Sequence, residues 1–140
     1  MKILLPVDGS DYTKRMLGYI AAHEELLGAG HEYVVVTAVT PVPPHVTHYL
    51  DRGTIDDYYK EQAEHVLRPV TAFAQQRGWN LRTTYVAGPA AVAIAQLVET
   101  EKPDLIVMGS HGHSALGNVI LGSVANGLLA RCKVPVLLIR

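Results

Sequence analysis

Five short runs of apolar residues constrain the fold of this 140-residue chain more than any other feature. They lie at residues 3–7, 33–39, 81–86, 105–108 and 134–139. Three of them are apolar at nearly every position, which is typical of strands in a parallel sheet whose two faces are both covered by helices. The run at 81–86 alternates more between apolar and polar residues, so we expect that strand to lie nearer an edge of the sheet.

The segments between the apolar runs have the periodicity of helices, with apolar side chains recurring at three- and four-residue steps. We expect helices at 11–27, 54–76, 90–101 and 122–131. The resulting order β-α-β-α-β-α-β-α-β predicts a three-layer α/β/α domain with right-handed crossovers. The chain shows no internal repeat and no second domain, so residues 1–140 are interpreted as a single domain.

Two of the expected helices begin with recognisable capping residues. Ser10 is a candidate N-cap for the first helix, because its hydroxyl can accept a hydrogen bond from a free backbone N–H. Thr54, with Asp57 three residues later, resembles a capping box at the start of the second helix.

The composition excludes several classes of function. Lys and Arg together number 12 against 13 Asp and Glu, which gives a net charge of −1 and argues against nucleic acid as the main partner. Cys132 is the only cysteine, so an internal disulfide framework and a multi-cysteine metal site are excluded. The chain has no run of 18 apolar residues, and its first apolar run is too short for a signal peptide. We therefore expect a cytosolic (cytoplasmic) protein that does not insert into membranes.

The glycine residues indicate where a ligand would bind. Ligands of open α/β sheets bind outside the carboxyl ends of the strands. The segment after the fourth expected strand, at 109–123, has the pattern G-x2-G-x9-G-S. Glycine lets backbone N–H groups approach a ligand closely, and a helix N-terminus at Gly122 and Ser123 favours an anion. We interpret this segment as a phosphate cradle with the Ser123 hydroxyl as an extra donor; the alternative is that the glycines only form turns.

Better-known phosphate-binding motifs are absent. Residues 117–123 have the glycine spacing of a P-loop but lack its lysine, and the Rossmann G-x-G-x-x-G pattern is missing. Without a catalytic cation the pattern argues against fast phosphoryl transfer. Asp8, after the first expected strand, is a candidate acceptor for a ribose hydroxyl or an adenine amino group. The alternative role of Asp8 is to offset the dipole of the helix that follows it.

With these residues in view, the sequence resembles the universal stress protein family over its whole length. The matching stretches are I-L-L-P-V-D-G-S at 3–10, P-D-L-I-V-M-G-S-H-G at 103–112, L-G-S-V-A at 121–125 and V-P-V-L-L-I at 134–139. The complete G-x2-G-x9-G-S pattern matches the nucleotide-binding signature of the family. The resemblance implies a Rossmann-like five-stranded parallel sheet in the order 3-2-1-4-5. It also implies an ATP site at the switch point between strands 1 and 4, and a homodimer.

The resemblance further implies which residues would contact ATP, which would bring Mg²⁺ or Mn²⁺ with it. Adenosine would lie near the end of the first strand, with the backbone of Val39 near the adenine, and the phosphates would be held largely by backbone amides. Family members often carry a basic residue where Asn118 stands, so a weaker grip on a triphosphate is expected here. The implied residues are Pro6, Val7, Asp8, Val39, Met108, Gly109, Gly112, Gly122, Ser123 and Val124.

Two other segments have predicted roles. Residues 40–53 form a proline-rich stretch without clear secondary structure that starts beside the expected adenine, so we predict that it folds over the nucleotide as a lid. The last strand is apolar and is expected at a sheet edge, where unpaired backbone groups invite pairing. We expect Val136 and Leu138, or their neighbours, to contact the same strand of a second subunit.

Taken together, the residues and the resemblance predict an ATP-binding, dimeric sensor or regulator of the stress response. Two alternatives stay open: a slow ATPase or phosphotransferase, and a nucleotide-free dimeric interaction scaffold. The seven histidines form no grouping typical of zinc ligands, so no catalytic residue and no metal ligand is assigned.

Overall fold

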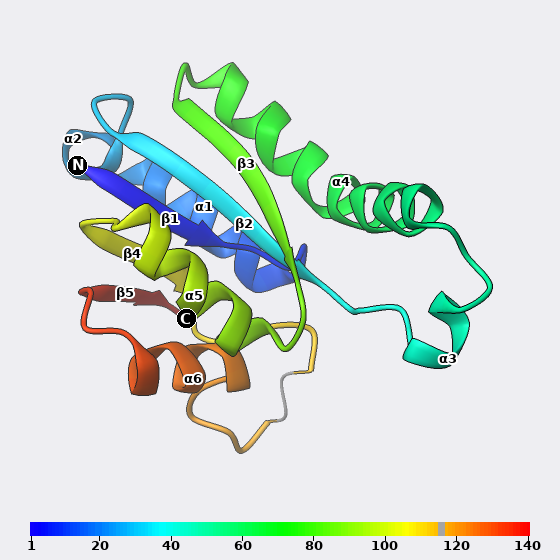
Figure 1. Ribbon diagram of the computed structural model, residues 1–140. Helices are drawn as coiled ribbons and strands as arrows, with labels where there is room; N and C mark the ends of the chain where they lie inside the picture. Colours follow the sequence, from blue (N-terminus) through cyan, green and yellow to red (C-terminus); the bar gives the residue numbers. More distant parts are fainter. Residues whose placement is uncertain (115–116) are drawn as a thin grey trace.

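A parallel sheet of five strands forms the centre of this computed structural model, which describes residues 1–114 and 117–140 (Figure 1). The order of the strands is β3-β2-β1-β4-β5, as the family resemblance implies. The alternating strand β3 lies at one edge, as its sequence predicts. The strands are β1 (Lys2–Pro6), β2 (Glu32–Val39), β3 (Asn80–Ala87), β4 (Leu105–Gly109) and β5 (Val136–Ile139).

Helices cover both faces of the sheet, α1 and α4 on one side and α5 and α6 on the other (Figure 1). This arrangement explains why the central strands are apolar at nearly every position. On β1, Ile3 and Leu5 pack into the core beneath α1 and α4, whereas Leu4 packs into the core beneath α5 and α6. The helices are α1 (Asp11–Ala22), α2 (Glu24–Leu27), α3 (Pro44–Thr47), α4 (Arg52–Gln76), α5 (Ala90–Glu101) and α6 (Ser123–Arg131).

Neighbouring strands are aligned so that their carboxyl ends lie along one edge of the sheet. Leu4 of β1 stands between Val34 of β2 and Ile106 of β4 in the parallel register, and all three side chains are fully buried. Among the described helices, none is both long and apolar enough to cross a membrane.

Two helix boundaries differ from the sequence-based expectation. The helix predicted over 11–27 breaks at His23, whose φ of −125° and ψ of 47° are not helical, so that it becomes α1 and the short α2. Helix α4 begins two residues before the predicted start, and its N-cap is Asp51 rather than Thr54. The Asp51 carboxylate accepts a hydrogen bond from the Thr54 N–H at 2.7 Å. Thr54 therefore contributes its backbone to the cap, and the predicted capping box is wrong.

At the opposite end of the sheet from the carboxyl edge, an ion-pair cluster joins β1, β3 and α5. The Glu101 carboxylate lies 2.8 Å from the Lys2 ammonium and receives two hydrogen bonds from the Arg82 guanidinium, at 2.7 and 3.0 Å. The Glu101 side chain is only 14% exposed. The hydrogen bonds from Arg82, and then that from Lys2, lower the pKa of Glu101 from 4.5 to about 2.

Replacing Glu101 by glutamine should lower the free energy of unfolding by about 1–2 kcal/mol at neutral pH, less than a fully buried pair would give because the cluster reaches the surface. The folded-state pKa of Glu101 is depressed, so this stabilisation is complete above pH 4.5 and is lost as the pH falls toward 2. Urea unfolding at a series of pH values should therefore show that the free energies of unfolding of the unaltered chain and of Glu101→Gln become equal between pH 5 and pH 2. The exposed Glu99→Gln change on the same helix is the control, and a constant difference for Glu101→Gln would contradict the prediction.

Candidate functional site

A cavity of about 400 Å³ opens at the carboxyl edge of the sheet, beside the ends of β1 and β4. The strand order reverses at β1, because β2 and β3 follow on one side of it and β4 and β5 on the other. The cavity therefore lies at the topological switch point of the sheet. Its volume falls within the range of about 300–1,000 Å³ that is usual for small-molecule sites.

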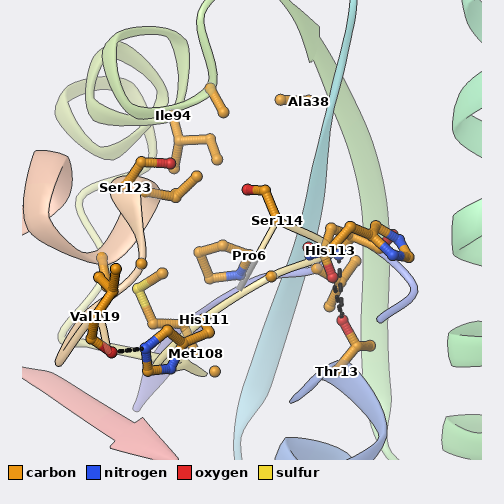
Figure 2. A pocket seen from close by; sticks show the side chains of 18 residues that line it. Pro6, Thr13, Ala38, Ile94, Met108, His111, His113, Ser114, Val119 and Ser123 are labelled. Atoms are coloured by element: carbon orange, nitrogen blue, oxygen red, sulfur yellow. Dashed lines mark hydrogen bonds between the residues drawn. The ribbon is translucent and has the colours of Figure 1, made fainter. Parts of the chain in front are cut away.

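The cavity brings together every predicted site residue except Val39. The side chain of Val39 is buried in the core on the α4 side, and the preceding Ala38 lines the cavity instead (Figure 2). Successive strand residues point to opposite faces, so the side chain of Val39 is turned away from the cavity. The resemblance places only the backbone of Val39 near the adenine, and that placement stays a prediction. The Val39 carbonyl accepts a hydrogen bond from Gly88 N–H at 3.3 Å.

The structure adds lining residues that the sequence reasoning missed. Ala90 and Ile94 lie one turn apart on α5 and close the cavity from above the sheet, and the helical period of α5 could have revealed them. The others come from α1, from the end of β2, from the loop between β4 and α6, and from α6 itself. These remaining residues are Thr13, Ala38, His111, His113, Ser114, Val119 and Ala125.

Among the described residues that line the cavity, Asp8 is the acidic one, and hydrogen bonds hold its carboxylate from several directions. One carboxylate oxygen, Oδ1, accepts hydrogen bonds from Ser10 N–H at 2.9 Å and from the Thr13 hydroxyl at 3.2 Å. Partial burial by itself raises the pKa of Asp8, but the hydrogen bonds from Ser10 and the neighbouring His113 outweigh it and lower the pKa. Asp8 is therefore an ionised acceptor, which is compatible with either role weighed from the sequence.

His113 fastens the glycine-rich loop to the end of β1. Its backbone N–H donates to Asp8 Oδ2 at 3.2 Å, and its ring Nε2 donates to the Asp8 carbonyl oxygen at 2.7 Å, although the two residues are 105 positions apart (Figure 2). Gly112 makes this approach feasible, because a Cβ at that position would collide with Asp8 Oδ2. The turn from β1 into α1 needs glycine as well, since Gly9 has a φ of +78°.

His111 holds the other half of the same loop. Its Nε2 donates to the carbonyl oxygen of Val119 at 2.7 Å (Figure 2), and its Nδ1 lies 2.9 Å from the hydroxyl of the buried Ser110. In the neutral ring, Nδ1 is then the acceptor and the Ser110 hydroxyl the donor. The imidazole also packs against the ring of Tyr12, with the two centroids 5.1 Å apart.

Gly122 brings the start of α6 against the end of β4. Its N–H donates to Ser110 O at 2.7 Å, and a Cβ on Gly122 would lie 2.9 Å from the Cα of His111. Gly122 therefore serves a close approach rather than a turn, since its φ of −69° and ψ of 163° are extended backbone. Helix α6 itself has no side-chain cap, so the N–H groups of its first turn remain available at the cavity, where Ser123 and Val124 stand.

The cavity combines apolar walls with backbone donors. Pro6, Ile94 and Met108 supply apolar surface, and the N-terminus of α6 supplies amides suited to an anion. Neither lysine nor arginine appears among the described lining residues. In the part of the chain that the structure describes, no group of three or more His, Cys, Asp or Glu residues is placed to hold a metal ion.

The proline-rich segment does not cover this cavity. None of residues 40–53 lines it, and α3 projects beyond the end of the sheet, away from α5 and α6 (Figure 1). The segment is held toward α4 instead, because Val42 N–H donates to the hydroxyl of Tyr59 at 2.8 Å. The predicted lid is therefore wrong for this structure.

Comparison with known proteins identifies the family of this chain. The sequence model of the universal stress protein family matches residues 1–140. A universal stress protein of Thermus aquaticus is 36% identical over 141 residues, which cover 99% of this chain and 97% of that protein. The chain belongs to the universal stress protein family.

Solved structures of this family share the fold described above. Protein MJ0577 of Methanocaldococcus jannaschii superposes with a TM-score of 0.80 at 24% identity, covering 99% of this chain and 94% of that chain. A family member from Arabidopsis thaliana with AMP bound superposes with a TM-score of 0.71 at 16% identity, covering 99% and 90%. Two further universal stress proteins, with TM-scores of 0.66 and 0.67, were solved in complex with cAMP and with dAMP.

The tight contact at Gly122 of this universal stress protein can be tested against a matched glycine. Gly122→Ala should destabilise the chain by about 1–3 kcal/mol, because the added methyl group meets backbone and forces the loop to shift. Gly117→Ala should change stability by less than about 0.5 kcal/mol, since no described atom lies within 4 Å of its Cβ position. Thermal unfolding of both variants measures the difference, and equal stabilities would contradict the close approach.

Proposed function

We propose that the cavity at the switch point binds an adenine nucleotide and that the chain acts as a dimeric, nucleotide-dependent regulator. The observation that carries this proposal is the pairing of apolar walls with the uncapped N-terminus of α6 in one cavity. That pairing suits a molecule with an aromatic base at one end and phosphate at the other. Relatives of the same fold bind AMP, cAMP and dAMP, which supports the choice of adenine.

The lining residues suggest how the ligand lies. The base and ribose would occupy the apolar part, between Ile94 and Met108, with the Asp8 carboxylate as acceptor for a ligand hydroxyl or amino group. The phosphates would lie against the amides at Gly122, Ser123 and Val124, as the resemblance implies. Because no lysine or arginine is among the described lining residues, phosphate binding would depend on the positions of the backbone amides.

ATP is the nucleotide that we propose, and we expect it to stay intact on the protein. Asp8 is the carboxylate that lines the cavity in the described structure, and both of its oxygens already accept hydrogen bonds from Ser10, Thr13 and His113. A carboxylate held in this way is a poor base for activating water. Mg²⁺ or Mn²⁺ would be carried by the phosphates of ATP. A regulator of this kind requires that the nucleotide bind two states of the protein differently.

The nucleotide proposal can be tested on the purified chain. Nucleotide released by denaturation should be identified first, and calorimetric titrations with adenosine, AMP and ATP should follow. Gly122→Ala should weaken AMP and ATP binding at least about tenfold by displacing the first amides of α6. Gly30→Ala should match the unaltered chain, because Gly30 does not line the cavity and has open space at its Cβ position. Steady ADP production with Mg²⁺ would favour the ATPase alternative, and no binding of any of the three ligands would refute the proposal.

We also propose that the homodimer forms through β5. The carbonyls of Pro135 and Ile139 accept hydrogen bonds from the β4 side, from Ile106 N–H and Ser110 N–H. Because backbone groups alternate in direction along a strand, those of Val136 and Leu138 point to the free edge. These are the residues that the sequence predicts at the interface, and their side chains are partly buried in the single chain.

Sedimentation velocity measures the proposed dimer directly. The unaltered chain should sediment as a dimer at micromolar concentration. Leu138→Pro should shift it to a monomer, because proline removes an outward N–H but none of the bonds to β4. Circular dichroism of the variant confirms that the fold is retained, and a monomeric unaltered chain would exclude this interface.

A further inference from the structure

A second cavity, of about 550 Å³, lies behind the wall of the first. It is lined from α1 by Tyr12 and Arg15, from the end of β4 by Ser110 and His111, and from the residue after β5 by Arg140. The two cavities share His111 and Val119, so the hydrogen bond from His111 Nε2 to Val119 O forms the partition between them.

The second cavity is cationic, in contrast to the first. Arg15 and Arg140 both line it, and no Asp or Glu appears among the described residues that line it. Within the described structure, neither Arg15 nor Arg140 takes part in an ion pair, although five other basic side chains do. Two like charges that face one concavity raise its positive potential, and an anion bound between them lowers the energy of the arrangement.

The position of Arg15 is set by packing. Its guanidinium carbon lies 4.8 Å from the centroid of the Tyr12 ring, and that ring in turn packs against His111. Tyr12 itself is fixed on the end of β4, because the Cβ of Tyr12 occupies the space that a side chain on Gly109 would need. A stacked guanidinium keeps its fork of N–H donors free for a second ligand, which suits the planar or tetrahedral oxygens of an oxyanion.

From these contacts we infer that the second cavity binds a phosphate group through Arg15 and Arg140. The phosphate could come from a separate small molecule or from the terminal phosphates of a nucleotide in the first cavity. The stack of Arg15, Tyr12 and His111 then connects the bound phosphate to the partition, and so to the loop that carries the α6 amides. Only the second source rests on the proposed function.

Calorimetric titration with inorganic pyrophosphate tests this inference. The titration is made on the full chain saturated with AMP, so that the first cavity is filled. Arg15→Gln and Arg140→Gln should each weaken pyrophosphate binding at least about tenfold, which is the loss expected for one charge-assisted hydrogen bond. Arg68→Gln is the matched control, because Arg68 is equally cationic but lies on α4 and is paired with Glu64.

Competition distinguishes the two sources of phosphate. If ATP displaces pyrophosphate while adenosine does not, and Arg15→Gln weakens ATP but not AMP, the phosphates of the nucleotide occupy the second cavity. If pyrophosphate still binds in the presence of ATP, the ligand is a separate molecule. The inference is overturned if both arginine variants bind pyrophosphate and ATP as the Arg68 variant does. If AMP fails to bind at all, the proposed function fails, while the arginine comparison is still measured on the protein alone.

Discussion

Burial of the central strands on both faces is the constraint on which the rest of this structure depends. Leu4 packs toward α5 and α6, while Ile3 and Leu5 pack toward α1 and α4, so β1 needs helices on both sides. Parallel strands in such a sheet are joined by crossover helices, and each crossover returns the chain to the same edge. All the strands therefore end at one edge, and this topology alone brings together the loops that follow β1 and β4.

Those loops are held together by contacts that glycine alone permits. Gly112 leaves room for the Asp8 carboxylate, and Gly122 leaves room for the backbone of His111. The sequence left two readings of these glycines, as turn residues or as a phosphate cradle. In the structure the missing side chains let the loop pack against the protein itself, and this packing sets the N-terminus of α6 at the cavity. The phosphate cradle remains our proposal for what that N-terminus binds.

The elements and the edge position of β3 follow from the apolar runs, because hydrophobic period and burial are local properties that a sequence displays directly. The full strand order came from the family resemblance. The details that were missed depend on geometry that no local pattern records. Ala38 was missed because which residues of β2 turn their side chains to the cavity depends on the facing of the strand, and the break at His23 interrupts a helix without proline or glycine at that position. The bonds from His113 to Asp8 join residues 105 positions apart.

Although the net charge of the chain is near zero, its charged side chains are unevenly distributed at this edge of the sheet. The first cavity has backbone donors and no lysine or arginine among its described residues, whereas the second has two arginines and no acidic side chain among its own. Binding through fixed amides depends on the position of the backbone and so responds to a single added methyl group. Binding through exposed guanidinium groups depends on charge and is weakened by salt. One loop, held at His111 and His113, thus separates the two proposed binding surfaces, which would respond to different physical variables.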